Sequence, residues 1–258
     1  MGSIERRWQE TRFAEYNIEP IGLSGRDHVI VLSLDTTTRA GSAAVIDNRQ
    51  IRHELTGDAT ATHGERLPGQ LIRVLEGAGL GVSDVDLLAV AAGPGSFTGL
   101  RVGIATMQGL AVSTGRRVVP VSALDALARA ARDSGSRIAA WMDAQRGQVF
   151  AALYEADGHP VAAPTALSPA ETLEAWGRDV RSSPSVLFIG DGAIRYAGLI
   201  RAELGDAAGI AEAPPLAGII GLMASDAPER AVAPHAVVPI YIRRPDAELA
   251  RLQRTSRG

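Results

Sequence analysis

The sequence of 258 residues contains no cysteine and no lysine, and only 4% of it is aromatic. Without cysteine there is no disulfide bond, no thiolate metal site and no cysteine nucleophile, which is typical of a protein in a reducing compartment. The low aromatic content requires a core built from aliphatic side chains. All 26 basic residues are arginine, which we interpret as the codon bias of a GC-rich genome and not as a functional signal.

Long apolar runs and a strong net charge are also missing. The longest apolar stretches are shorter than the roughly 20 residues that a membrane-spanning helix needs, and the first residues lack the apolar centre of a signal peptide. A chain that binds nucleic acid by itself usually has a clear excess of basic residues, whereas this chain has a net charge of −3. We therefore expect a soluble cytoplasmic protein without a membrane partner.

The most informative stretch is AAGPGSFTGLRVGIATMQGLAVSTG at 91–115. An apolar strand precedes it, Gly93-Pro94-Gly95 makes a sharp turn, and Ser96 caps a helix at 97–112. Such a turn before a helix N-terminus can hold a phosphate, but it can equally be a tightly packed turn. Because the helix is apolar on nearly every side, we expect it to be buried. Its core stripe is Leu100, Ile104, Met107 and Ala111, and a second helix is expected against Gly99, Gly103 and Thr106.

The rest of the chain alternates between strand and helix patterns. Strands are predicted at 29–34, 42–46, 51–55, 85–92, 118–121, 137–142, 149–155 and 186–189. Helices are predicted at 62–78, 122–131, 168–176 and 216–226, and another begins near 190. Both halves consist of a strand hairpin followed by helices, which predicts an internal duplication of the architecture.

The string GPGSFTGLRVGIAT closely resembles the signature of the bacterial TsaB (YeaZ) family. HGERL at 63–67, DAQRG at 143–147, GDGA at 190–193 and PIYIR at 239–243 resemble further segments of that family in the same order. The resemblance covers about 29–249. Gly64 stands where the family has serine, and Pro68 comes one place earlier than the family's proline. The resemblance therefore does not predict the exact shape of the first two turns of helix 62–78.

The resemblance implies an α/β fold of the ASKHA (actin-like ATPase, Hsp70 and sugar kinase) type, with two duplicated subdomains that each hold a mixed β-sheet flanked by helices. We place the subdomains at 28–119 and 120–245. An N-terminal arm at 1–27, interpreted as mobile, precedes them, and a basic tail at 246–258 follows.

The implied role is that of a non-catalytic subunit required for threonylcarbamoyladenosine modification of tRNA. By resemblance it binds and stabilises a catalytic TsaD-like subunit, works with a TsaE-like ATPase, forms a homodimer when alone and contacts tRNA only indirectly. The family uses helices 62–78 and 97–112 both for self-association and for TsaD. The implied interface residues are His63, Glu65, Arg66, Leu71, Ile72, Leu75, Arg101 and Gln108. On a helical wheel Ile72 lies beyond the core stripe, so it is predicted to be exposed.

Active ASKHA proteins hold nucleotide phosphates at strand-end turns. The matching positions here are Asp35, Thr36, Thr37, Gly93, Gly95, Ser96, Gly190, Asp191 and Gly192. Each turn also has a structural explanation, as a strand-end or helix-start turn. GDGA is shorter than the usual adenosine loop, so we expect no cofactor bound in isolation and at most weak ATP binding. The alternative is an active ASKHA ATPase or phosphotransferase, although no residue stands out as a catalytic base.

Histidine spacing argues against a metal site. The catalytic relative TsaD binds its metal with two histidines spaced H-x-x-x-H on a helix, and no two histidines of this chain have that spacing; they are His28, His53, His63, His159 and His235. We therefore predict no metal site, which makes a glycoprotease-type metallopeptidase the least favoured function.

Overall fold

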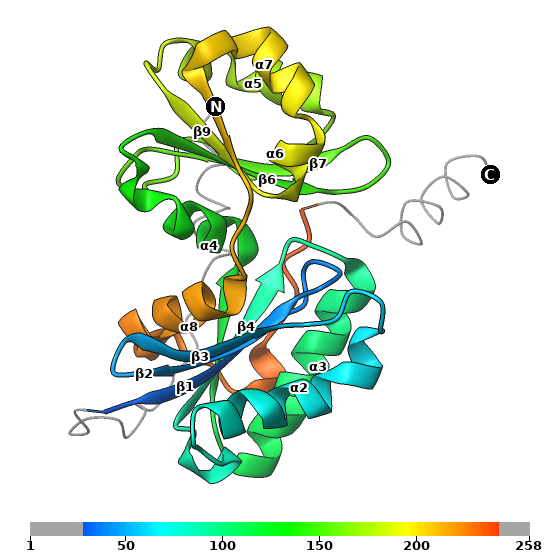
Figure 1. Ribbon diagram of the computed structural model, residues 1–258, viewed down its shortest axis with the longest axis vertical. Coiled ribbons are helices and arrows are strands. Elements are labelled where there is room, and N and C mark those ends of the chain that lie inside the picture. The colour runs from blue at the N-terminus through cyan, green and yellow to red at the C-terminus, as the bar shows by residue number, and fades with distance from the viewer. Residues whose placement is uncertain (1–27, 243–258) are drawn as a thin grey trace.

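The structure is a computed structural model that describes residues 28–242. The predicted arm at 1–27 and tail at 246–258 lie outside these residues. The described chain forms two five-stranded mixed sheets, one in each lobe, with helices on both faces of the sheets (Figure 1). The ends of the described elements agree with the predicted ones to within a few residues, except that the helix predicted at 168–176 continues to Arg181.

The helices and strands fall into two consecutive parts of the chain. The first part supplies β1 (Ile30–Asp35), β2 (Ser42–Asp47), β3 (Gln50–Thr56), α2 (His63–Gly77), β4 (Leu87–Gly93), α3 (Phe97–Thr114), β5 (Val118–Ser122) and α4 (Ala123–Ala130). The second part of the chain supplies β6 (Arg137–Asp143), β7 (Val149–Tyr154), β8 (Thr165–Leu167), α5 (Pro169–Arg181), β9 (Val186–Ile189), α6 (Asp191–Arg195), α7 (Ala197–Leu204), β10 (Ala208–Ala211) and α8 (Leu216–Asp226). The short strands β8 and β10 had no clear sequence signal.

The two sheets have the same topology. The first has the order β3-β2-β1-β4-β5 and the second, read from its other edge, has the order β8-β7-β6-β9-β10. In each sheet, the first three strands of the repeat pair antiparallel with one another. The remaining two strands run parallel to the first strand of the repeat and to each other. The predicted internal duplication is therefore confirmed strand by strand.

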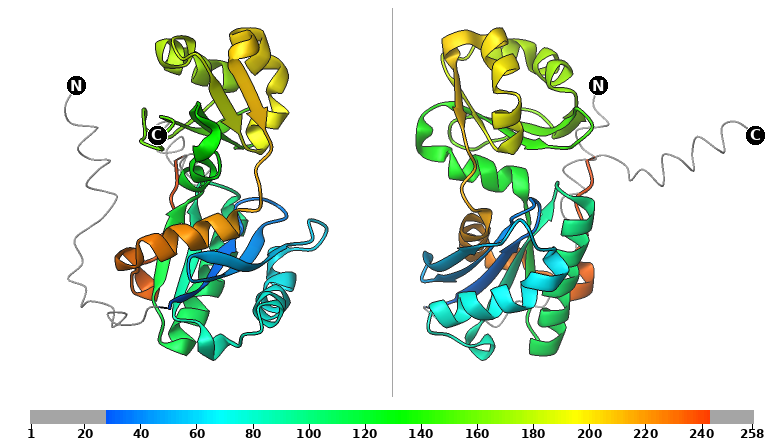
Figure 2. Two further views of the ribbon diagram at one scale, coloured as in Figure 1. Left: turned by 60° about the vertical axis from the view of Figure 1, so that its left-hand side comes forward. Right: turned by 45° about the vertical axis from the view of Figure 1, so that its right-hand side comes forward.

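Alternation along the strands decides which helices cover which face. In β1, Leu32 and Leu34 pack with α2 and α3, whereas Val31 packs with α8 on the opposite face. Figure 2 shows α8 and the α2–α3 pair on opposite sides of the first sheet. In the second lobe, α5 and α7 cover one face and α4 covers the other.

The last helix of each repeat lies on the sheet of the other lobe. Helix α4 follows the first repeat and packs on β6, while α8 follows the second and packs on β1 and β2. These two helices also contact each other, and one hydrophobic cluster contains residues of both sheets and of both helices. The subdomain boundary expected between 119 and 120 falls inside β5, and α8, which belongs by sequence to the second subdomain, covers the first sheet.

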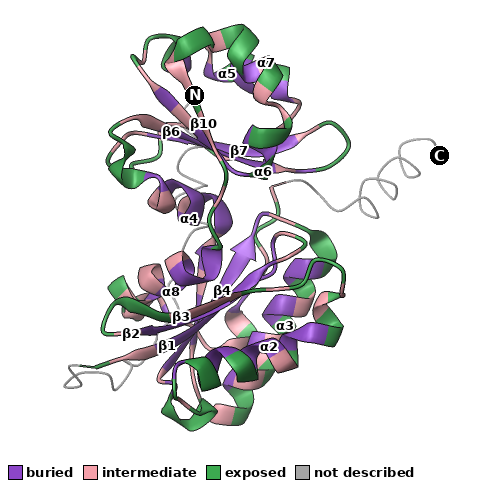
Figure 3. Cartoon of the chain, viewed as in Figure 1, coloured by how far each residue is buried: buried purple, intermediate pink, exposed green. Residues whose placement is uncertain are grey.

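Helix α3 is buried on one side only. Its predicted core stripe is buried, but a second stripe faces solvent along the whole helix (Figure 3). The expectation of burial all round was wrong, because the pattern cannot distinguish a small apolar residue in the core from one on a surface. Within residues 28–242, no helix combines the length and hydrophobicity that crossing a membrane requires.

Candidate functional site

Four strand-end turns lie at the facing edges of the two sheets, and we use the term cleft only as a name for this region. Strands β1 and β4 are parallel, and so are β6 and β9, so their carboxyl ends lie at the same edge of each sheet. These ends carry Asp35, Gly93, Asp143 and, directly after β9, Gly190. The negative charge of Asp191 contributes to raising the pKa of Asp35, so the two edges face each other closely enough to interact electrostatically.

Asp35 is buried and has its hydrogen bonds satisfied within the chain. Its Oδ1 accepts hydrogen bonds from the backbone N–H and the hydroxyl of Thr37, at 2.8 and 2.6 Å. Burial raises the pKa of Asp35, and the charge of Asp191 adds to that effect, while Thr37 and the nearby Arg66 oppose it. A buried carboxyl that favours its proton can act as an acid or can respond to a bound cation.

The end of β1 packs directly on the small-residue stripe of α3. A Cβ built on Gly103 would overlap the hydroxyl of Thr36 and come within 3.1 Å of its Cβ, and one on Gly99 would overlap the Thr36 carbonyl oxygen. From helix α2, His63 lies 3.3 Å from the Cβ position of Gly99. The stripe thus accommodates both the end of β1 and the start of α2, the second helix that was expected there. Among residues 28–242, the buried Thr36 hydroxyl has no hydrogen-bond partner.

The glycine turn before α3 is covered by the chain on two sides. The N–H of Ser96 donates to the Thr37 carbonyl at 3.0 Å, and the Ser96 hydroxyl accepts from Gly99, which confirms the predicted cap. Gly93 has a φ of 121°, and a Cβ there would lie 2.6 Å from the carbonyl oxygen of Ile240. A phosphate at this turn therefore competes with contacts that the chain already makes.

The turn of the second lobe is organised by Asp191. Its Oδ1 accepts from the backbone N–H of Asp143 and of Gly192, at 2.9 and 2.8 Å. Loss of hydration and the neighbouring Asp143 raise the pKa of Asp191, whereas these hydrogen bonds oppose the shift. Gly190 and Gly192 both pack against the end of β6. The short turn thus serves to join β9 to α6.

Asp143 also lies at this edge; it begins the DAQRG segment at 143–147 that resembles the family, but it was not among the predicted phosphate-binding residues. Its carboxylate accepts two hydrogen bonds from Gln145 and forms an ion pair with Arg195 at 3.2 Å. The signal that could have found it is the duplication itself, since β6 is the counterpart of β1 and Asp143 ends β6 as Asp35 ends β1.

The start of α2 is tied to the cleft by a histidine and an arginine. His63 Nε2 lies 3.1 Å from the Thr38 carbonyl oxygen, and its Nδ1 lies 2.6 Å from a guanidinium nitrogen of Arg66. Since the carbonyl needs a donor and the guanidinium an acceptor, His63 is neutral with its proton on Nε2. Burial and the Arg66 charge lower its pKa accordingly. Arg66 is buried and also donates to Gln70 and to the Arg39 carbonyl.

Three of the eight implied interface residues are buried in the single chain. Leu71 and Leu75 lie in the core cluster under α2, and Arg66 is held in the network just described. Glu65 is exposed, but its carboxylate accepts hydrogen bonds from the backbone and hydroxyl of Thr62. The exposure predicted for Ile72 is confirmed, at 53%.

The exposed face of α3 is bordered by the end of the described chain. Gln108 donates to the carbonyl oxygens of Pro234 and Val237, and Arg101 lies 3.9 Å from the centre of the Phe97 ring. Arg101 also donates to the Tyr241 hydroxyl at 3.3 Å. Beyond Gln108, Val112 is 72% exposed beside an open groove of ≈ 570 Å³. We call the exposed surface of α2 and α3, with Ile72, Phe97 and Val112, the α2–α3 face.

A metal site is not evident in the part of the chain that the structure describes. No three His, Asp or Glu side chains among residues 28–242 come together in a way that could hold a metal ion. The expectation of no metal site remains a prediction for the whole chain.

Comparison with known proteins identifies the family. The profile of the family described as TsaD, tRNA N6-adenosine threonylcarbamoyltransferase, matches residues 53–191, more than half of the chain. A TsaB protein of Haemophilus influenzae is 38% identical over 125 residues, and TsaB of Escherichia coli is 33% identical over 129 residues. The crystal structure of YeaZ from Pseudomonas aeruginosa superposes with a TM-score of 0.69 at 27% identity, covering 83% of this chain and 99% of that one. The chain belongs to the TsaB (YeaZ) family.

The extent of the match differs between relatives. The chain spans about half the length of the curated TsaB proteins, with 52% of the H. influenzae protein and 55% of the E. coli protein covered. An uncharacterized protein of Mycobacterium tuberculosis is 31% identical over 221 residues, which are 84% of this chain and 93% of that protein. A dehydratase activator from Clostridium difficile, solved with bound ADPNP, superposes with a TM-score of 0.51 at 13% identity and shows only that the ASKHA fold is shared.

Proposed function

We propose that this TsaB-family chain is a subunit of the machinery for tRNA threonylcarbamoyladenosine biosynthesis, and that it acts by binding a catalytic TsaD-like subunit. The role in that biosynthesis is the one that the names of the TsaB relatives give for those proteins. The structural observation that carries the proposal is the α2–α3 face, where apolar side chains meet solvent. The complete assembly would include a TsaE-like ATPase, and tRNA would be contacted through the partner, in the cytoplasm.

The α2–α3 face has the composition of an association surface. Ile72, Phe97 and Val112 are exposed on it, and full burial of side chains of this kind contributes roughly 1.5–3 kcal/mol each. A second copy of the chain and a TsaD-like subunit would use the same face. A homodimer in isolation would therefore give way to the heterodimer when the partner is present.

A charge placed on the face tests this association. Ile72→Arg should keep the fold, because Ile72 is half exposed, but it should weaken both associations by burying an unpaired charge. Ile194→Arg is the matched control, since Ile194 is 49% exposed and lies on α6 in the other lobe. Light scattering of each variant, alone and mixed with the partner, should show reduced masses only for Ile72→Arg. Equal masses for both variants would place the interface elsewhere.

The cellular role has its own test. Deletion of the gene should lower the threonylcarbamoyladenosine content of tRNA, measured by mass spectrometry of its nucleosides. The wild-type gene and Ile194→Arg should restore it, and Ile72→Arg should restore it less. Normal modification in the deletion strain would overturn the proposed function.

An active ASKHA ATPase remains the second candidate, on one specific observation. The cleft holds a buried Asp35 with a raised pKa beside a Thr36 hydroxyl that has no partner. Against it, the turns at Gly93 and Gly190 are packed against the chain itself, so we expect weak ATP binding and negligible turnover. Hydrolysis at about 1 per second or faster, abolished by Asp35→Ala, would favour this candidate.

A further inference from the structure

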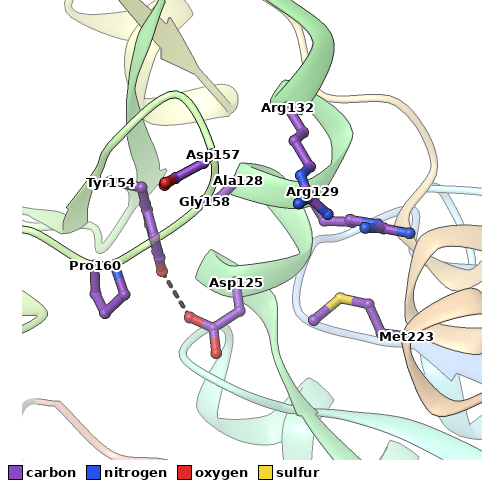
Figure 4. A pocket seen from close by; sticks show the side chains of 9 residues that line it. All are labelled: Asp125, Ala128, Arg129, Arg132, Tyr154, Asp157, Gly158, Pro160 and Met223. Atoms are coloured by element: carbon purple, nitrogen blue, oxygen red, sulfur yellow. Dashed lines mark hydrogen bonds between the residues drawn. The ribbon is translucent and has the colours of Figure 1, made fainter. Parts of the chain in front are cut away.

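A pocket of ≈ 260 Å³ lies at the junction of the lobes, between helix α4, the loop after β7 and helix α8 (Figure 4). It shares no lining residue with the strand-end turns of the cleft or with the α2–α3 face. Its volume is just below the roughly 300–1,000 Å³ of pockets that enclose drug-sized ligands. It therefore suits a molecule smaller than a nucleotide.

The pocket is lined by two arginines and two aspartates, of which Asp125 lies on α4 with Arg129, and Asp157 lies in the loop after β7. Figure 4 shows Arg129 and Arg132 on the side of α4, and Tyr154 and Asp157 across from them. Arg129 is already paired with Asp226, at 3.1 Å. Within residues 28–242, Arg132 makes no hydrogen bond or ion pair, so its guanidinium is available to an anion.

The acidic side offers one carboxylate that is only partly used. Asp125 accepts a hydrogen bond from the Tyr154 hydroxyl at 2.7 Å, which fixes both groups. Asp157 accepts from the backbone N–H of His159 and is otherwise exposed, with His159 Nε2 4.0 Å away. Met223 of α8 adds an apolar surface next to the arginine side (Figure 4).

We propose that this pocket binds a small zwitterion with an aliphatic spacer, its anionic group on Arg132 and its cationic group on Asp157. A ligand with only one charge would leave one of these side chains without a partner, so both ends of the ligand are recognised. The anionic group would contact Arg132, just after α4, and the cationic group the loop after β7, while the spacer lies along the apolar lining to which Met223 of α8 belongs. A bound molecule would thus contact elements of both lobes.

The test uses 4-aminobutanoate as the probe, with butanoate and butylamine as analogues that keep one charge each. Binding to the full chain is followed by NMR titration, using the Met223 methyl and the Gly158 amide as reporters. Arg132 and Asp157 are exposed, and an exposed charge pair changes affinity by up to about fivefold. We therefore expect each single-charge analogue to bind about two- to fivefold more weakly than 4-aminobutanoate.

Two variants assign the ends of the ligand. Arg132→Gln should lower the affinity for 4-aminobutanoate to that for butylamine, and Asp157→Asn should lower it to that for butanoate. Arg178→Gln, an exposed arginine of α5 outside the pocket, is the control and should bind as the wild type does. Equal affinity of 4-aminobutanoate and butanoate, equal behaviour of Arg132→Gln and the control, or no shift of the reporters would each overturn the proposal. None of these results bears on the proposed function.

Discussion

Replacing Gly103 by alanine probes the contact between α3 and the end of β1. The added methyl group would overlap the Thr36 hydroxyl and come within 3.0 Å of its Cγ2 and 3.1 Å of its Cβ. Rotating the Thr36 side chain cannot remove this conflict, because its Cβ does not move with the rotation. Thr36 is completely buried, so it has no free space to enter.

Gly109→Ala is the matched control on the same helix, since a Cβ there meets no atom within 4 Å. Both substitutions gain the helix propensity of alanine over glycine, roughly 1 kcal/mol. Only Gly103→Ala adds the overpacking cost, about 1–3 kcal/mol. The free energy of unfolding of Gly103→Ala should therefore lie about 1–3 kcal/mol below that of Gly109→Ala.

Urea denaturation at fixed pH measures this difference through the midpoint, provided that the slope is unchanged. Thr36→Ala should reduce the difference, because it deletes the two Thr36 atoms nearest to the new methyl group and leaves only the contact with Cβ at 3.1 Å. The hydroxyl that it removes has no hydrogen-bond partner, so its loss is inexpensive in itself. Equal midpoints for Gly103→Ala and Gly109→Ala in the wild-type background would refute the close packing.

Three further predictions follow from single contacts. The pKa of Asp35 is raised in the folded state, so the wild type has its full stability only below the ordinary carboxyl pKa of about 4. Asp35→Asn should therefore have a higher urea midpoint than the wild type at neutral pH, and this difference should disappear as the pH falls to about 4. An equal gain at every pH would contradict this. The pKa of His63 is lowered in the folded state, so the free energy of unfolding should fall as the pH drops below the ordinary histidine pKa of about 6.5. The wild type should then lose stability relative to His63→Gln. Parallel pH profiles of the two proteins would contradict this prediction. Gln108→Ala removes two hydrogen bonds to residues 234–237 and should speed amide exchange there, as seen by mass spectrometry, with unchanged exchange counting against it.

The sequence predicted the elements of the fold because periodicity and caps are local. The alternation in β1 and the glycine turn at Gly93 can be recognised from the local sequence, without knowing which segments pack against them. Ser96 caps α3 as expected. The surroundings of α3 could not be predicted in the same way. Its small-residue stripe fits a threonine from a segment far away in the chain, and a helical wheel does not identify the partner.

The burial of Arg66 was also beyond local reasoning. Arginine is rarely buried without partners, and its partners here come from separate segments: Gln70 on its own helix, His63 one turn before, and the carbonyl of Arg39. The site also requires Gly57, because a side chain there would overlap the guanidinium. Such a set is visible only once β2, β3 and α2 have been placed against one another.

The duplication explains why the candidate cleft draws on four distant segments. Each repeat places three parallel strands side by side, and the first two of them, β1 and β4 or β6 and β9, end at the turns of the candidate site. Since α4 and α8 each lie on the sheet of the other lobe, the two edges share a single hydrophobic core beneath them. Helices α2 and α3 contact the end of β1 directly: His63 contacts the Thr38 carbonyl, and Gly99 and Gly103 lie against Thr36. A displacement of either helix would therefore alter these contacts at the strand-end turns. The α2–α3 face and the strand-end turns are therefore linked by direct contacts through the end of β1.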